Sequence, residues 1–298
     1  MFKTRNRKFL GTLAGIAAAV CYGTNPLGAL NLYSEGLSTN SVLLYRFGIA
    51  SIIVAIVLIA RKESFKVNAR EFKVLSALGI LFVVSSFTLY SSFHYMDAGV
   101  ASTLLFTYPI MTAVIMALFF KERIGWQVVV SILLSFVGVS LLYWSGSSGR
   151  LSTVGVLLVL VSALTYAVYI IISNRGHLQM SPFKVTFYVL LYCALFNLIV
   201  PLVTGQPIDG LHTPKAWFYA LWLAVVPSIF ALTLLSYAAK HIGSTPTSIL
   251  GALEPLTAVL IGIFIFNEEF SFRLAIGIVL ILAAVIIIIL KPSKSNPS

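Results

Sequence analysis

The chain has 298 residues, of which 59% are hydrophobic and only 10% are charged, and its mean hydropathy is +0.99. These values lie far outside the range of soluble domains and predict a polytopic membrane protein. The net charge of +11 would suit a nucleic-acid partner. The basic residues, however, are spread over the connections between apolar segments, which indicates membrane topology and argues against nucleic-acid binding.

Ten apolar segments, each long enough to cross a bilayer as a helix, follow one another along the chain. The basic N-terminus resembles a signal peptide, but the first apolar run continues to about Leu32, which is too long for a cleaved signal. The connections are short, so we expect ten spans and no soluble domain. The predicted spans are 10–31, 41–60, 72–94, 99–120, 125–144, 154–172, 183–204, 214–239, 244–266 and 272–290.

The placement of lysine and arginine predicts the orientation. If the N-terminus is cytoplasmic, the cytoplasmic segments hold 16 of these residues and the opposite side holds three. The positive-inside rule therefore predicts that both termini are cytoplasmic and that the number of spans is even.

The two halves of the chain repeat each other. A shift of 144 residues aligns Gly11, Ala19 and Tyr22 with Gly155, Ala163 and Tyr166. A shift of 146 residues aligns Ser102, Leu104, Pro109, Phe120 and Glu122 with Ser248, Leu250, Pro255, Phe266 and Glu268. Residues 1–148 and 149–298 would each hold five spans, an odd number that gives the halves opposite orientations. The predicted fold is an all-α integral membrane protein of ten helices in two inverted five-helix repeats, an architecture typical of secondary transporters.

The ninth predicted span carries Glu254 directly before Pro255, near its centre. A carboxylate at this depth costs roughly 2.5–3.5 kcal/mol, so it should face protein or a wet cavity. The proline is expected to kink the helix. One face of this span has only small or polar residues, so it fits either a cavity wall or a close helix contact. Its residues are Thr247, Gly251, Glu254, Ala258 and Gly262. Glu254 itself is either functional or a satisfied structural acid.

Other polar or helix-breaking residues also fall inside spans. Arg46 lies a short way into the second span and either snorkels to the interface, binds a substrate carboxylate or phosphate, or pairs with Glu254. The first span is interrupted at residues 22–26, which predicts a packing kink, a gate or a substrate contact. In the third span, Ser85, Thr88 and Ser92 recur at helical spacing. This polar face is expected either to line a cavity, which we favour, or to bond a neighbouring helix.

Taken together, these residues form one predicted set. Its cavity members are Tyr22, Asn25, Arg46, Ser85, Thr88, Tyr90, Tyr108, Tyr166, Tyr237, Ser248 and Glu254. Its kink or gating members are Pro26, Pro109, Pro227 and Pro255. Tyr108 precedes its proline as Glu254 does in the other repeat, so the halves share a kink and differ in charge.

No pattern for catalysis, metal binding or a cofactor is present in the sequence. The histidines (His94, His177, His212 and His241) show no metal-ligand spacing, and Cys21 and Cys193 are expected to be unpaired thiols. The loop acids are expected to be solvated: Asp97, Glu122, Glu268 and Glu269. We therefore predict no metal, no cofactor and no enzymatic activity.

Three stretches resemble the EamA-type transporters of the drug/metabolite transporter superfamily. They are YRFGIA around Arg46, YPIMTAVIMALFFKE from Tyr108, and LEPLTAVLIGIFIFNEE from Leu253. The resemblance covers nearly the whole chain. It implies a ten-helix carrier of the bacterial inner membrane, with a central cavity open alternately to each side, and export of amino acids or related metabolites. By this resemblance, the functional positions of the family correspond to Arg46, Tyr108-Pro109 and Glu254-Pro255.

The expected function is secondary transport, in the export direction, of a small metabolite such as an amino acid, with membrane lipid as surroundings. A proton carried by Glu254, or a counter-substrate, could drive it. A nucleotide-sugar or phosphorylated-metabolite exchanger is the alternative, although it would need more mid-depth cations than Arg46. A membrane-embedded enzyme or scaffold is a more distant alternative, and the sequence lacks the reactive cluster or soluble domain that it would need.

Overall fold

The computed structural model describes residues 2–121, 126–144, 152–176, 178, 180–242, 247, 250–269 and 271–289. In these residues the regular structure is helical and no strand occurs, which confirms the all-α class. Seven described helical segments are long and apolar enough to cross a membrane. Three shorter apolar helices lie at 129–138, 253–266 and 272–287. Each predicted span therefore overlaps one of these ten stretches.

The helices of the first half begin and end at residues that explain their bounds. Ser38 caps α3 by accepting from the Ser41 N–H, and Asn68 forms a capping box with Glu71 at the start of α4. Lys121, with φ of 55°, ends α6. The helices are α1 (Phe2–Gly23), α2 (Asn25–Ser34), α3 (Thr39–Ala60), α4 (Ala69–Ser92), α5 (Ala98–Leu105), α6 (Tyr108–Phe120) and α7 (Trp126–Trp144).

The second half follows the same rules. Ser181 and Thr213 accept N–H groups at the starts of α9 and α10, and Gly205, with φ of 70°, ends α9. The helices are α8 (Thr153–Arg175), α9 (Pro182–Thr204), α10 (Pro214–Val225), the π-helix η1 (Val226–Phe230), α11 (Ala231–Ile242), α13 (Leu253–Phe266) and α14 (Phe272–Ile289).

Four of the predicted spans are interrupted where a proline falls. Proline has no backbone N–H, but it fits the first turn of a helix, where that N–H would have no partner within the helix. Each of these prolines therefore lies in the first turn of a helical segment: Pro26 in α2, Pro109 in α6, Pro227 in η1 and Pro255 in α13.

The ninth span differs from its prediction. We expected one kinked helix over 244–266 with Glu254 near its middle, but the chain turns at residues 251–252 and α13 begins at Leu253. Glu254 therefore lies in the first turn of a helix. The fourth span, expected as one helix over 99–120, is likewise divided, into α5 and α6.

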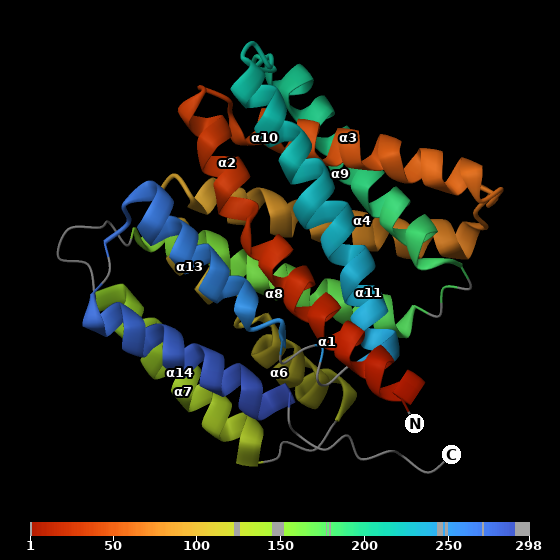
Figure 1. Cartoon of the computed structure of the whole chain (residues 1–298). Coiled ribbons are helices and arrows are strands. Elements are labelled where there is room, and N and C mark those ends of the chain that lie inside the picture. Colours follow the sequence, from red (N-terminus) through yellow and green to blue (C-terminus); the bar gives the residue numbers. More distant parts are fainter. Residues whose placement is uncertain are drawn as a thin grey trace.

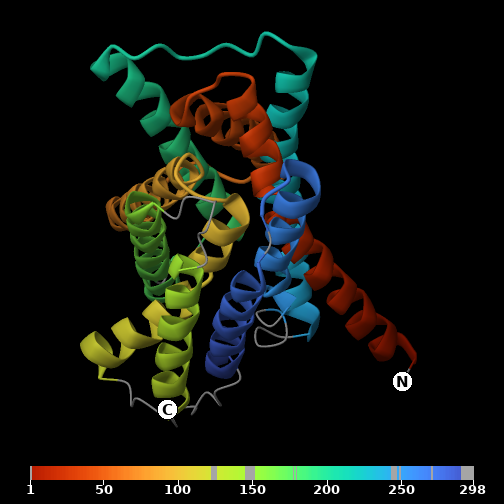
Figure 2. The ribbon, with the colours of Figure 1, turned by 90° about the vertical axis from the view of Figure 1, so that its left-hand side faces the viewer.

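Helices of the first half pack against helices of the second. Figure 1 shows α7 beside α14 and α3 beside α9, and the contacts also pair α4 with α8, α1 with α11, and α5 with α13. Figure 2 shows the connection at 205–213 crossing one end of the molecule. The core between these pairs contains many buried alanines, which allow helices to approach closely.

Polar contacts join the connections at each end. At one end, Asp209 accepts hydrogen bonds from the Ser38 N–H (2.7 Å) and the Ser41 hydroxyl (3.0 Å). Glu35 there accepts from Thr213 (2.6 Å) and pairs with Lys215 (3.1 Å), and these two bonds lower the pKa of Glu35. At the opposite end, Ser181 donates to Glu63, and the Lys184 ammonium donates to the Lys66 carbonyl (2.6 Å). The connections that the charge pattern assigns to one side are therefore in contact with each other.

Candidate substrate pocket

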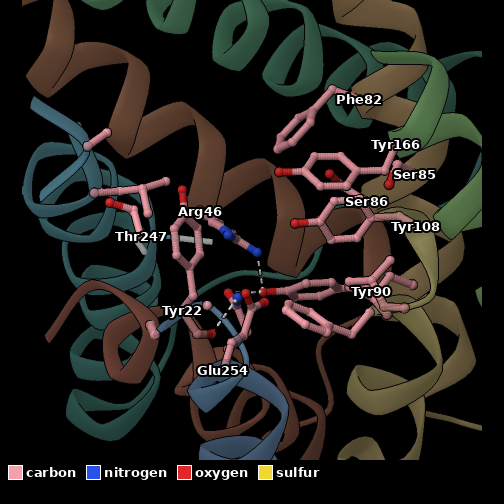
Figure 3. A pocket seen from close by; sticks show the side chains of 18 residues that line it. Tyr22, Arg46, Phe82, Ser85, Ser86, Tyr90, Tyr108, Tyr166, Thr247 and Glu254 are labelled. Carbon is pink, nitrogen blue, oxygen red and sulfur yellow. Dashed lines mark hydrogen bonds between the residues drawn. The ribbon is translucent and has the colours of Figure 1, made fainter. Parts of the chain in front are cut away.

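A partly open cavity of about 320 Å³ lies where the interrupted spans meet. Its walls come from α1, α2, α3, α4, α5, α6, α8, α11 and α13, so both halves of the chain contribute (Figure 3). Eight of the eleven predicted cavity residues line it: Tyr22, Asn25, Arg46, Ser85, Tyr90, Tyr108, Tyr166 and Glu254. Ser248 is outside the described residues.

Thr88, a predicted cavity residue, is not among the residues that line this cavity. The face of α4 that lines it holds Phe82, Ser85, Ser86, Leu89 and Tyr90, at the spacing of a single helix stripe. Thr88 lies off that stripe, and its hydroxyl donates back to the Val84 carbonyl (2.8 Å).

Tyr237 also lies outside the lining of this cavity. α11 presents Leu235 and Ala239, one turn apart, to the cavity, and Tyr237 lies between them in sequence and so on another side of the helix. Its side chain is 39% exposed and stacks on His241 with ring centroids 4.0 Å apart.

Arg46 is buried and points into the protein, so it does not snorkel to the interface. It is 7% exposed, its Nε donates to the Ser228 hydroxyl (3.2 Å), and its Nη1 donates to the Tyr90 hydroxyl. The guanidinium carbon also lies 5.0 Å from the ring centre of Phe47 and 5.3 Å from that of Tyr90, within cation–π range. These partners are all uncharged, so the positive charge is not neutralised by them.

A chain of hydrogen bonds extends from Arg46 to the break in the first span. The Tyr90 hydroxyl donates to Asn25 Oδ1 (3.2 Å), and Asn25 Nδ2 donates to the Tyr22 carbonyl (2.8 Å). The Tyr22 carbonyl lies at the end of α1, where the break has removed helical partners. The polar residues of this break therefore hold the end of α1 and the Arg46 side chain together.

Glu254 faces the same cavity from the start of α13 (Figure 3). Among the described residues its carboxylate makes no hydrogen bond and no ion pair within 4.0 Å, so the predicted direct pairing with Arg46 does not occur. A helix N-terminus favours negative charge, which partly compensates the burial of this acid. α1 lies very close here, because a Cβ on Gly23 would come 2.6 Å from the Glu254 carbonyl oxygen.

One wall of the cavity is aromatic. Tyr108 meets Tyr166 edge-to-face with ring centroids 4.8 Å apart, and Phe106 meets Tyr108 in the same way at 5.8 Å. The ring centroid of Phe82 lies 6.2 Å from that of Tyr166, and the ring of Tyr169 stacks on Tyr166 with centroids 5.7 Å apart. Figure 3 shows Phe82, Tyr166 and Tyr108 on one side of the cavity, with Tyr22 and Thr247 on the other. The cavity therefore combines an aromatic wall with two opposite charges.

Several residues of the site were not found from the sequence. Phe82 and Ser86 share a helix stripe with Ser85, so the periodicity of α4 in the correct register would have indicated them. Ser228 follows Pro227, and a hydroxyl beside a proline inside a span was a signal that could have been used. Phe106 carries no such signal, because aromatic residues are common in every span.

Glu268 was expected to be a solvated loop acid, and this prediction is wrong. Its carboxylate accepts the backbone N–H groups of Ala98 (2.9 Å) and Gly99 (3.4 Å) at the start of α5. Burial raises the pKa of Glu268 to about 7, although the two N–H groups favour its charged form. An acid of the second half therefore caps a helix of the first.

Comparison with known proteins identifies the family. The sequence model of the EamA-like transporter family matches residues 9–144 and again residues 153–290. An uncharacterized transporter of Archaeoglobus fulgidus is 25% identical over 93% of this chain and 95% of its own. The uncharacterized transporter YyaM of Bacillus subtilis is 24% identical over 85% of this chain and 86% of its own.

A protein of known crystal structure superposes with a TM-score of 0.69 at 17% identity, over 93% of this chain and 95% of the other. At that identity the likeness concerns the fold alone. The repeated family match and the transporter relatives cover nearly the whole sequence. The chain therefore belongs to the EamA-like transporter family, within the drug/metabolite transporter superfamily.

Proposed function

We propose that the protein is a secondary transporter that exports a small zwitterionic metabolite, an amino acid with an apolar or aromatic side chain, across the bacterial inner membrane. The observation that carries this proposal is the pairing of charges in the cavity. Among its described lining residues, Arg46 is the one cation and Glu254 the one carboxylate. Neither is neutralised by an ion pair within the described protein.

The two charges fit the two ends of an α-amino acid. Arg46 can bind a carboxylate through two parallel N–H bonds, and Glu254 can accept from an ammonium group. The aromatic wall around Tyr108 and Tyr166 suits an apolar or aromatic side chain. A cavity of 320 Å³ lies at the small end of the range for ligand sites, which favours a metabolite of this size over a nucleotide sugar.

We propose that residues 1–148 and 149–298 are two inverted five-helix repeats. The helix contacts support this arrangement. When each helix of a packed pair is replaced by its equivalent in the other repeat, most of the resulting pairs are also in contact. The packing of α1 on α11 corresponds to that of α8 on α4, and the packing of α4 on α9 corresponds to that of α10 on α3. Five spans in each repeat give the halves opposite orientations.

Alternating access would result from movement of two groups of helices relative to each other, and each group contains helices from both halves of the chain. α1, α11 and α13 form one wall of the cavity, and α4, α6 and α8 form the other. α3 and α9 are packed along their length and joined near both ends by the contacts of Asp209 and Glu63, so we assign them a supporting role. We propose that the two walls rock against each other with the helix breaks as flexing points.

The charge pattern supports an orientation with both termini in the cytoplasm. Leu235, Ala239 and Thr247 extend the cavity towards the connection near Lys240, which this orientation places on the cytoplasmic side. We propose that the other end is closed around Tyr33, whose hydroxyl donates to the Tyr90 carbonyl (3.0 Å) and whose ring lies tilted against that of His94 with centroids 4.2 Å apart. The structure would then be the state that takes up substrate from the cytoplasm.

Flux measurements in proteoliposomes test this proposal. We expect saturable counterflow of radiolabelled L-phenylalanine and L-leucine, stimulated by an opposing pH gradient if Glu254 carries the coupled proton. Arg46→Gln should abolish the flux, and Tyr237→Phe, outside the cavity, should not change it. Saturable exchange of nucleotide sugars without amino-acid flux would favour the alternative substrate class, and an unsaturable leak would contradict a carrier mechanism.

A further inference from the structure

The eighth span contains a feature that the transport mechanism above does not explain. Between α10 and α11 the chain forms the short π-helix η1, and π-helical turns occur often at functional sites. Pro227 lies in it and has no N–H, so the Leu223 carbonyl loses its usual helical donor. The Ser228 hydroxyl donates to that carbonyl at 2.9 Å. The serine therefore replaces the bond that the proline cannot make.

This bond fixes what Ser228 can offer to Arg46. A serine hydroxyl has one hydrogen, and here it points to Leu223, so towards the guanidinium only oxygen lone pairs remain. Arg46 Nε donates to this oxygen at 3.2 Å, and Ser228 is 4% exposed. A buried hydroxyl that is free to rotate could present either its hydrogen or its lone pairs, but this one presents lone pairs.

Tyr90 completes the same arrangement on the other side of the guanidinium. Its hydroxyl hydrogen goes to Asn25 Oδ1 (3.2 Å), so its oxygen also accepts from Arg46. Among the described residues these are the two hydrogen-bond partners of the Arg46 side chain. The guanidinium has five N–H donors, so most of them remain available to the cavity that Arg46 lines.

Neutral partners matter because of the charge balance. An acid in contact with Arg46 would neutralise it and compete with an anionic ligand, whereas two hydroxyl groups orient it and leave its charge. We propose that Ser228 is the positioning residue for Arg46, and that the proline-induced π-turn holds the guanidinium ready for the anionic group of the substrate. This inference rests on the proposed function only in requiring a substrate with an anionic group.

A matched pair of probes tests the proposal without knowledge of the natural substrate. 3-Phenylpropanoate and 3-phenylpropanamide have nearly the same shape and differ in charge, and their binding to the purified full chain in detergent can be measured by calorimetry. The wild type should prefer the anion. Ser228→Ala should weaken anion binding by about 10-fold and change amide binding by less than about 2-fold, because one bond that orients a charged group is lost.

Two further variants serve as rescue and control. Ser228→Thr keeps the hydroxyl and should recover most of the preference for the anion. Ser236→Ala removes a serine of the same span whose hydroxyl bonds the Leu232 carbonyl (2.9 Å) on the exposed side of α11, and it should bind both probes as the wild type does. If Ser228→Ala does not fold, Ser228→Cys replaces it, since a thiol is a weak acceptor of similar size and should lose the preference.

Three outcomes would overturn the proposal. One is a wild type that binds the amide as well as the anion. Another is equal weakening of both probes by Ser228→Ala, as expected if the serine only supports the bend. The third is unchanged binding in Ser228→Ala while Arg46→Gln loses the anion. Amino-acid flux is measured separately, so a failure of the proposed substrate class and a failure of this inference give different results.

Discussion

The fourth and ninth spans have the same break and different chemistry. In each, a proline lies in the first turn of a helix, and the residue before it faces the cavity: Tyr108 before Pro109 and Glu254 before Pro255. Tyr108 packs on Tyr166 as part of the aromatic wall. Glu254 contributes a charge without a direct partner among the described residues. The repeat thus provides one backbone feature twice, and the side chain on it determines what each copy contributes.

The neighbours of the two breaks also differ. Gly23 in α1 allows close contact with the start of α13, since a Cβ there would come 2.4 Å from the Thr257 Cβ. The repeat aligns Gly23 with Ala167 in α8, which is fully buried but keeps its methyl group. The backbone of α1 therefore lies closer to the start of α13, the break that carries Glu254 and is called the acidic break below, than an alanine at position 23 would permit.

The largest effect is expected from removing the charge at the acidic break. Glu254→Gln should lower flux by roughly 10- to 100-fold, because a charge-assisted bond to the substrate is lost, and should also remove the response to a pH gradient. Tyr108→Phe, the matched change at the other break, should alter flux by no more than about 2-fold. Proteoliposome flux of L-phenylalanine measures both. Full activity of Glu254→Gln would show that the two breaks do not differ as we propose.

A second prediction concerns the close approach at Gly23. Gly23→Ala should lower the free energy of unfolding by about 1–3 kcal/mol, because the new methyl group would overlap the Glu254 carbonyl oxygen and force α1 away from α13. Thermal unfolding in detergent measures the change, and flux should fall with it.

Gly48→Ala is the control for this change, because a Cβ at Gly48 in α3 would meet nothing within 4 Å. It should leave stability unchanged or slightly raised. Equal unfolding temperatures for Gly23→Ala and Gly48→Ala would argue against a tight contact at the acidic break.

The aromatic side of the comparison predicts a change in selectivity. Tyr166→Ala should raise the KM for L-phenylalanine by about 3- to 10-fold, because an aromatic contact is lost, and should leave the KM for L-alanine nearly unchanged. Tyr237→Ala removes a tyrosine outside the cavity and should affect neither substrate. If Tyr166→Ala raised both KM values equally, the aromatic wall would not be a specificity element.

The sequence predicted some of these features and missed others for physical reasons. Glu254 and Arg46 could be assigned to a protein-lined site because an ionised group cannot remain against hydrocarbon. The form of the breaks could not be predicted, since the pattern around Pro255 fits a kinked helix as well as a new helix start. Thr88 lies outside the cavity lining because packing against other helices sets the rotation of α4, and the sequence alone does not show that packing. Serine hydroxyls are common in spans, so the role of Ser228 emerged only from its contacts with Leu223 and Arg46.

The smallest effect concerns Glu268, which links the two broken spans by capping the start of α5 from the end of α13. Burial raises the pKa of Glu268 to about 7, above the value of about 4.3 in an unfolded chain. The folded protein therefore binds this proton more tightly, and stability should rise as the pH falls from about 7 towards about 4.3. Glu35 has a lowered pKa and acts in the opposite direction, but only at pH values near or below about 4.

Unfolding temperatures between pH 8 and pH 5 separate these contributions. Glu268→Gln, which cannot ionise, should gain less stability on acidification than the wild type does, and this difference is the contribution of Glu268. Glu269→Gln, a change at the adjacent exposed acid, is the control and should keep most of the wild-type slope. An unchanged slope in Glu268→Gln would assign the pH response to other groups. The protonation of Glu268 would then not affect the stability of the contact between α13 and α5.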